Sequence, residues 1–218
     1  MHLWRFDTGI TMLRADLYEK SIRLESYVSP HDCRACGFQS RREFLERLRA
    51  GSLKPAQCGL TRSRLLSLLW AASPGELLPQ VEVLQLPDPV PAGLIPVNAP
   101  GSRSPILISG NSRLTVEVLA AVLATTSSPF WYFLVDTQGH TVDMALVYQV
   151  LTADRIGQAF LEEPALRQAV KAPLVLPGLA APLREKLAEQ ARRTVTVGPV
   201  CAAELPLFFG EQAWQVSC

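Results

Sequence analysis

The sequence predicts an α/β fold, in which a Rossmann-like parallel sheet has helices on both faces and follows a small helical domain with cysteines. Four short apolar segments begin at residues 105, 130, 174 and 195, and each runs into Gly, Ser, Thr or Pro. Residues 130–135 (FWYFLV) show no alternation, which is typical of a strand covered on both faces. Helical patterns between the segments favour parallel strands with right-handed crossovers, whose ends form a ligand crevice.

The chain divides by composition into three parts. We expect a small helical domain over residues 1–72, a proline-rich linker over 73–104 and the α/β domain over 105–218. In the first part, Phe44, Leu45 and Leu48 lie at helical spacing within a helix over 41–50 that Gly51 ends, and a second helix covers 60–72. Eight prolines between residues 73 and 105 exclude a long regular element there and predict a linker wrapped on the surface.

Polar residues at the strand ends predict where the helices of the α/β domain begin. Asn111 and Ser112 are expected to cap a helix that continues to Ala124, and Thr152 a helix that continues to Leu161. The loop at Gly178 leads into a helix over 183–191. The helix N-termini would direct backbone N–H groups at the crevice, an arrangement that suits a phosphate group.

Composition excludes several classes of protein. With 218 residues and 48% hydrophobic content, the chain is long and apolar enough to bury a full core. A net charge of +1 gives no basic field for nucleic acid, and no apolar run approaches the roughly 20 residues of a membrane span. The N-terminus lacks the apolar region of a signal peptide, and five cysteines, an odd number, suit a reducing compartment, so we expect a cytoplasmic protein.

Three motifs of the α/β domain occur in a characteristic order. They are DTQG at residues 136–139, LVLPGLAAPL at 174–183 and VTVGPVCAAELPLFF at 195–209. Together they resemble the corrinoid-binding C-terminal domain of the large (gamma) subunit of the corrinoid iron-sulfur protein of acetyl-CoA metabolism, over residues 104–210. A more distant resemblance is to the corrinoid protein of mercury methylation. The resemblance implies a cobalamin bound base-off, with its nucleotide tail among the strand-end loops and no protein histidine required on cobalt.

The resemblance assigns the corrinoid contacts to the strand-end loops and to the helix after the DTQG motif. The expected cofactor-binding residues are Ser109, Asn111, Thr115, Asp136, Thr137, Gly139, Thr141, Val142, Met144, Ala145, Pro177, Gly178, Leu179, Ala180, Gly198 and Pro199. From the residues alone, the glycines could equally serve turns that need a positive φ, and Asp136 could cap a turn. Under the corrinoid hypothesis, a β-branched residue at Gly139 or Gly178 abolishes binding and leaves the fold largely intact.

Two side chains near the DTQG motif are candidates for contact with cobalt. Met144 stands where the acetyl-CoA family has Thr and the mercury-methylation family has Cys. A methionine there either fills the core, or faces the ring and lies under cobalt or ligates it weakly. Since mercury methylation needs the thiolate, that activity is disfavoured. His140 occupies a position that is apolar in relatives, and we expect it to be solvent-facing or hydrogen-bonded rather than a ligand.

The cysteines of the first part have the spacing C-x2-C-x4-R-x16-C, formed by Cys33, Cys36, Arg41 and Cys58. The resembled family has a fourth cysteine at the position of Arg41 and holds a [4Fe-4S] cluster. Arginine cannot coordinate iron, so we expect a substoichiometric cluster or none. A nonprotein ligand or His31 could complete the cluster, and the three cysteines with His31 could instead bind zinc. Cys201 and Cys218 are expected to be free thiols.

The leading hypothesis is a corrinoid carrier in methyl transfer or corrinoid-dependent one-carbon metabolism, rather than a self-sufficient enzyme. The resembled subunit has a TIM-barrel domain between its two other domains, and this chain has a linker there. The upper face of the ring would therefore need a methyltransferase, another partner protein or a second copy of the chain. Two alternatives remain: a noncatalytic corrinoid carrier or assembly module without its cluster, and an α/β domain that binds another nucleotide-like ligand.

Overall fold

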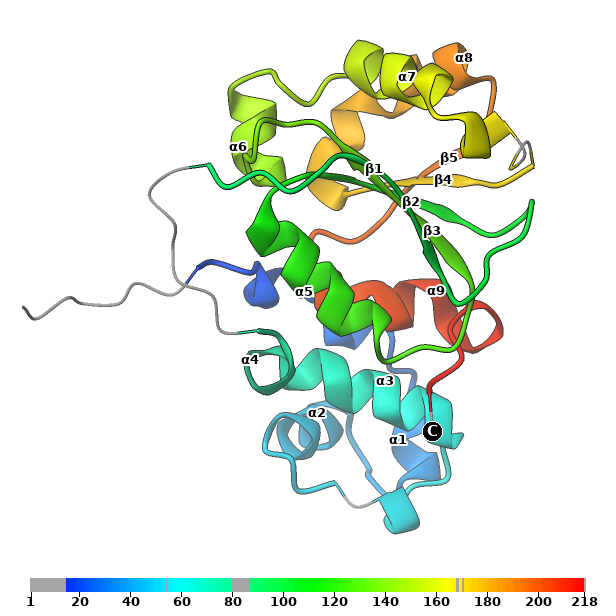
Figure 1. Cartoon of the computed structure of the whole chain (residues 1–218). Helices are drawn as coiled ribbons and strands as arrows, with labels where there is room; N and C mark the ends of the chain where they lie inside the picture. Colours follow the sequence, from blue (N-terminus) through cyan, green and yellow to red (C-terminus); the bar gives the residue numbers. More distant parts are fainter. Residues whose placement is uncertain (1–14, 54, 80–86, 168, 170, 218) are drawn as a thin grey trace, which may run out of the picture.

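A five-stranded sheet lies at the centre of the larger part of the molecule, with helices on both of its faces (Figure 1). This computed structural model describes residues 15–53, 55–79, 87–167, 169 and 171–217. The strands are β1 (Gly93–Val97), β2 (Ile106–Gly110), β3 (Phe130–Val135), β4 (Leu174–Leu176) and β5 (Val195–Val197). Their spatial order is β1-β3-β2-β4-β5, so the four strands expected from the sequence form a parallel sheet and the α/β fold class is confirmed.

The chain reverses direction across the sheet between β2 and β4. From β2 it moves outward to β3, and it then returns to place β4 and β5 on the other side of β2. Such a switch point leaves a crevice at the carboxyl ends of the two strands, because their connections run to opposite sides. The predicted ligand crevice therefore belongs between the loops that follow β2 and β4.

The helices form one group before the sheet and another between its strands. The first group contains the α-helices α1 (Pro30–Ala35), α2 (Arg41–Arg49), α3 (Arg62–Ala72) and α4 (Pro74–Leu77), with short 3-10 turns η1 (Glu19–Ser21), η2 (Leu24–Ser26) and η3 (Pro55–Gln57). The second contains α5 (Arg113–Leu123), α6 (Val142–Val147), α7 (Ala153–Glu162), α8 (Arg184–Ala191) and α9 (Leu205–Ala213), with η4 (Pro164–Arg167), η5 (Gly178–Leu183) and η6 (Ala202–Glu204).

Local sequence accounts for most helix boundaries. Phe44, Leu45 and Leu48 are buried on one face of α2, as their spacing predicts, and Gly51 follows the helix with a φ of 62°. Thr152 caps α7 by accepting a hydrogen bond from the Arg155 N–H. The prediction of a side-chain cap on α5 is wrong, because neither the Asn111 nor the Ser112 side chain accepts a hydrogen bond from an N–H group of the first turn.

At α5, a backbone carbonyl of residues 87–90 replaces the missing side-chain cap. Ser112 holds the N-cap position without a side-chain cap bond, and the Arg113 N–H instead donates to the Asp88 carbonyl at 2.9 Å. The Arg113 guanidinium also pairs with the Asp88 carboxylate at 2.7 Å. Residues 87–90 are thus attached to the loop between β2 and α5.

The proline-rich segment contains more regular structure than the sequence indicates. Both α4 and β1 lie within residues 73–104, and β1 pairs with β3 in antiparallel orientation. Pro96, opposite Trp131, is tolerated because β1 is an edge strand, where a missing N–H interrupts no second ladder. The expectation of a plain surface linker is therefore wrong for residues 93–97.

Two hydrophobic clusters cover the two faces of the sheet. One contains Ile108, Phe133 and Leu176 with side chains of the α6–α8 region, and the other contains Leu107 and Tyr132 with α5 and α9. The second cluster continues without a break into α2 and α3, so the N-terminal helices share it (Figure 1). The predicted division into domains stays a prediction, although its two folded parts share this cluster. Among the described helices, none has the length and apolarity that crossing a membrane requires.

Candidate ligand-binding site

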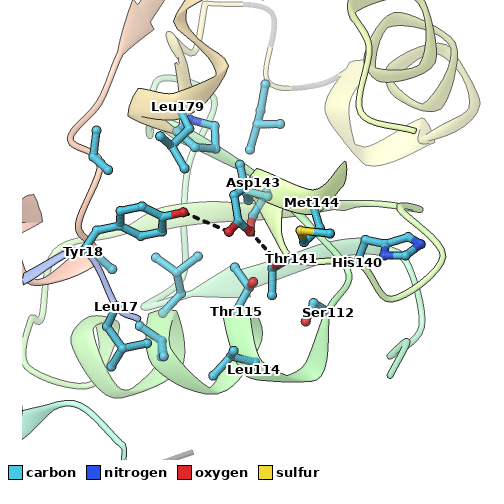
Figure 2. Close-up of a pocket in the computed structure, with 18 of the residues that line it drawn as sticks. Leu17, Tyr18, Ser112, Leu114, Thr115, His140, Thr141, Asp143, Met144 and Leu179 are labelled. Carbon is cyan, nitrogen blue, oxygen red and sulfur yellow. Dashed lines mark hydrogen bonds between the residues drawn. The ribbon is translucent and has the colours of Figure 1, made fainter. Parts of the chain in front are cut away.

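A cavity of about 520 Å³ lies at the carboxyl ends of β2 and β4, at the switch point of the sheet. Its walls come from β2, β4, α5, the start of α6, the loop after β5 and residues 15–18 (Figure 2). Apolar side chains predominate, which suits an organic ligand held by a few placed polar groups. The expected binding residues that line this cavity are Ser109, Thr115, Gly139, Thr141, Val142, Met144, Pro177, Leu179, Gly198 and Pro199.

The other expected binding residues do not line the cavity and make contacts within the protein instead. They are Asn111, Asp136, Thr137, Ala145, Gly178 and Ala180. Ala145 and Ala180 are fully buried in the cluster on the α6–α8 face of the sheet. Asp136 caps the following turn by accepting a hydrogen bond from the Gln138 N–H at 2.9 Å, which is the structural alternative considered from the sequence.

Asn111 fastens the loop after β2 to the loop after β3. Its side-chain oxygen accepts hydrogen bonds from the backbone N–H groups of Thr137 at 2.9 Å and Gly139 at 3.2 Å. Its amide group donates to the Val90 carbonyl at 2.8 Å. Asn111 and Thr137 are 3% and 0% exposed. Their hydrogen bonds therefore lie in the interior and fix the loops whose other residues line the cavity.

The glycines of the motifs are required by close backbone contacts. Gly139 has a φ of 79°, and a Cβ there would lie 2.5 Å from the Pro89 nitrogen. A Cβ on Gly178 would lie 2.7 Å from the Val200 nitrogen, and one on Gly198 would lie 3.1 Å from the Leu176 carbonyl oxygen. Only Gly139 needs a positive φ. The expectation that Gly139 or Gly178 could be replaced with the fold largely intact is therefore revised, because the new side chains would displace neighbouring backbone.

Met144 and His140 both lie at the cavity (Figure 2). Met144 is 39% exposed, so the interpretation of this residue as a core filler is wrong, and its thioether is accessible to a bound ligand. The His140 ring lies 4.9 Å from the Tyr148 ring, centroid to centroid, at the edge of α6. Both side chains belong to one rim of the cavity.

The N-terminal wall of the cavity was not predicted. Residues 15–18 line it, and the Tyr18 hydroxyl donates to the Asp143 carboxylate at 2.8 Å (Figure 2). The Thr141 hydroxyl donates to the same carboxylate. Burial tends to raise the pKa of Asp143, but these two hydrogen bonds and backbone N–H groups outweigh it and hold the pKa below its usual value. Burial and the neighbouring carboxylate raise the pKa of Tyr18 to about 12.

Ser109 provides a polar group on the floor of the cavity. Its side chain is 1% exposed, and its hydroxyl interacts with the buried hydroxyl of Tyr132, whose pKa it lowers against the larger opposing effect of burial. Ser109 is thus one of the polar groups of the cavity lining, and its hydroxyl is shared with Tyr132.

Cys33 lies within α1, Cys36 lies at its C-terminal end, and Cys58 lies beside Cys36. Cys36 and Cys58 are joined in a disulfide, and Cys33 is a buried free thiol. No group of three His, Cys, Asp or Glu side chains that could hold a metal ion occurs in the described residues. Burial raises the pKa of Cys33, and the charge of Arg41 opposes this effect. The ligand set of three cysteines and the expected lack of a full [4Fe-4S] cluster both stay predictions.

Cys201 is also a free thiol, as expected. It is 1% exposed, and burial raises its pKa to about 11. A buried and protonated thiol is unreactive, so Cys201 acts as a small core residue. Cys218 lies outside the described residues.

The fold and the cavity define a doubly wound α/β protein with a ligand crevice at its switch point. Comparison with known proteins gives a more specific assignment. A family model described as the CO dehydrogenase/acetyl-CoA synthase delta subunit matches residues 75–209, which is more than half of the chain. The chain therefore belongs to this family.

Individual relatives are gamma subunits of the acetyl-CoA decarbonylase/synthase complex. The chain is 28% identical over 158 residues to subunit gamma 2 of Methanosarcina thermophila, covering 68% of this chain and 34% of that protein. It is 30% identical over 150 residues to subunit gamma of Methanosarcina acetivorans, covering 65% and 32% of the two chains. The chain thus spans about a third of the length of these relatives.

Proposed function

We propose that this protein binds a corrinoid, base-off, in the cavity at the ends of β2 and β4 and carries it in methyl transfer or other corrinoid-dependent one-carbon chemistry. The observation that supports this most directly is the gathering of expected contact residues from three separate motifs around one cavity. The volume of about 520 Å³ is suited to the nucleotide tail, with the ring at the rim beside Met144.

In this placement the corrinoid and the protein would have different roles. A bound corrinoid would supply cobalt as the methyl-carrying centre. The apolar walls would exclude water from the tail. Gly198 and Gly139 would keep the two flanking loops close to the cavity.

A protein partner is part of this proposal. Several large apolar side chains are exposed at or beside the rim, with Val147 at 71% and Tyr148 at 57%. The ring would leave its upper face open toward a methyltransferase, another subunit or a second copy of the chain. The names of the relatives place those proteins in a complex, which supports a partner for this chain.

A second candidate is a noncatalytic corrinoid carrier or assembly module. It is favoured by Arg41 at the expected ligand position. Methyl transfer from the cobalamin-loaded protein separates the two candidates, since only the first carries a methyl group on cobalt.

The test of the proposed function is an anaerobic titration with cobalamin, followed by visible absorption. We expect the spectrum to change to the base-off form and Thr115→Phe to abolish binding, because Thr115 lines the cavity. Thr125→Phe is the matched control, since Thr125 follows the same helix and does not line the cavity. If only a different nucleotide-like ligand binds, the corrinoid assignment is wrong and the cavity assignment stands.

A further inference from the structure

Residues 15–18 form a strap across one side of the cavity, far in sequence from the strand ends that form its floor. Leu17 and Tyr18 both line the cavity, together with Ala15 and Asp16. In Figure 2 Tyr18 reaches from this strap toward Asp143 at the start of α6. The strap therefore spans from the N-terminal part of the chain to the helix that carries Met144.

One hydrogen bond holds the strap to the far side of the cavity. The Tyr18 hydroxyl donates to the Asp143 carboxylate at 2.8 Å across a sequence separation of 125 residues. In the described residues, this is the one hydrogen bond between residues 15–18 and any element that lines the cavity. Because the acceptor is ionised, the bond is stronger than one between neutral groups.

The strap is held firmly at its other end. Ile22 and Leu24, which follow η1, are 8% and 3% exposed in the core, and Leu17 and Tyr18 pack partly buried against the same cluster. Between these anchors and the bond to Asp143, Tyr18 adopts a left-handed backbone with a φ of 57°. Two hydrogen bonds from Ser21 to the Tyr18 carbonyl hold this turn, so the backbone at Tyr18 is fixed on the side of the core and the side-chain bond to Asp143 is a separate attachment.

We infer that residues 15–18 are a gate over the ligand site, closed by the hydrogen bond between Tyr18 and Asp143. This inference rests on the proposed function for the nature of the ligand, a corrinoid whose tail passes beneath the strap. The ligand gains access when the bond opens, and it is released by the same route. Tyr18 and Asp143 thus control the rates of binding rather than the chemistry on cobalt.

The test compares Tyr18→Phe with Tyr27→Phe. The Tyr27 hydroxyl donates to the Glu204 carboxylate at 2.8 Å, so the control loses an equivalent bond, and Tyr27 does not line the cavity. Stopped-flow binding of cobalamin gives the association and dissociation rates. For Tyr18→Phe we expect both rates to rise about 10- to 100-fold in parallel, with the Kd within about threefold, as loss of one charged hydrogen bond implies. Tyr27→Phe should leave both rates unchanged.

Two outcomes overturn the gate. Unchanged rates for Tyr18→Phe show that the strap does not control access. A rise in the dissociation rate alone, with a weaker Kd, shows that Tyr18 contacts the ligand directly and is no gate.

A measurement without ligand separates the gate from the proposed function. Amide hydrogen exchange of residues 15–22 in the ligand-free full chain should be faster in Tyr18→Phe than in the wild type or in Tyr27→Phe. If cobalamin does not bind the wild type but this exchange difference is seen, the corrinoid assignment fails and the gate stands. If the exchange of the strap is the same in all three proteins, the gate is wrong whatever the ligand.

Discussion

At the scale of single residues, Gly139 shows how the site depends on backbone shape. We predict that Gly139→Ala lowers the free energy of unfolding by about 2–5 kcal/mol, since it combines a left-handed backbone with an overlap at Pro89. Gly101→Ala is the control, because a Cβ there meets nothing within 4 Å, and it should change stability by less than about 0.5 kcal/mol. Thermal unfolding of both variants measures the difference. Equal stability of the two variants would contradict the contact with Pro89.

Arg41 is the residue on which the cluster prediction depends. We predict that anaerobically purified wild type contains little or no [4Fe-4S] cluster, and that Arg41→Cys raises its iron and sulfide content by supplying a fourth thiolate. Arg42→Cys adds a thiol one position further along α2 and should not raise either value. Analysis of iron and sulfide per protein checks the prediction. A full complement in the wild type would mean that another ligand exists and that Arg41 is not a lost one.

Individual site residues could be predicted where they lie in or near a strand-end motif. Ten of the sixteen expected residues line the cavity, and five of these ten belong to the three motifs: Gly139, Pro177, Leu179, Gly198 and Pro199. Tyr18 and Asp143 could not be found in this way, since their contact joins positions 125 residues apart and neither belongs to a local pattern. The buried environment of Ser109 likewise depends on how the sheet is covered.

At the scale of elements, the two loops after β2 and β3 act as one unit joined by Asn111. We predict that Asn111→Ala lowers the free energy of unfolding by about 2–4 kcal/mol, because it leaves buried N–H groups of Thr137 and Gly139 without an acceptor. Asn98→Ala is the control: its amide also donates two hydrogen bonds to backbone, but the residue is exposed. Urea unfolding compares the variants. A loss for Asn111→Ala no larger than that for Asn98→Ala would rule out this role.

The regular elements followed from sequence where hydrophobic pattern and turn residues agree. The four parallel strands and helices α2, α3 and α7 are of this kind. Strand β1 was missed because Pro96 argues against a strand, and only the edge position in the sheet makes it acceptable. The cap of α5 was missed because its acceptor, the Asp88 carbonyl, is backbone supplied by a distant segment.

At the scale of the whole molecule, a shared hydrophobic cluster joins the N-terminal helices to the sheet. Leu68 of α3 is fully buried in the same cluster as Trp214, which follows α9. The Tyr27 bond to Glu204 also joins the two parts. The sequence indicated two folded parts but not this shared packing, since which helix faces cover each other is not encoded in any single segment.

We predict from this packing that the protein unfolds in one cooperative transition. Leu68→Ala should lower the midpoint of that single transition, at a loss of about 2–5 kcal/mol, and should not create a separate early one. Leu77→Ala, at an exposed leucine of the same region, should have little effect. Circular dichroism and tryptophan fluorescence should give coincident curves. Two resolved transitions would show that the helical part and the sheet are independent.

We propose that the cavity at the switch point binds a corrinoid through its nucleotide tail. The most direct test of this proposal is anaerobic titration with cobalamin and, in parallel, with cobinamide, which has the ring but no nucleotide. We predict that cobalamin binds with a base-off spectrum and that cobinamide binds at least tenfold more weakly, because the tail contributes most of the buried contact. A base-on spectrum, equal affinity for the two compounds, or no binding of cobalamin would contradict the account.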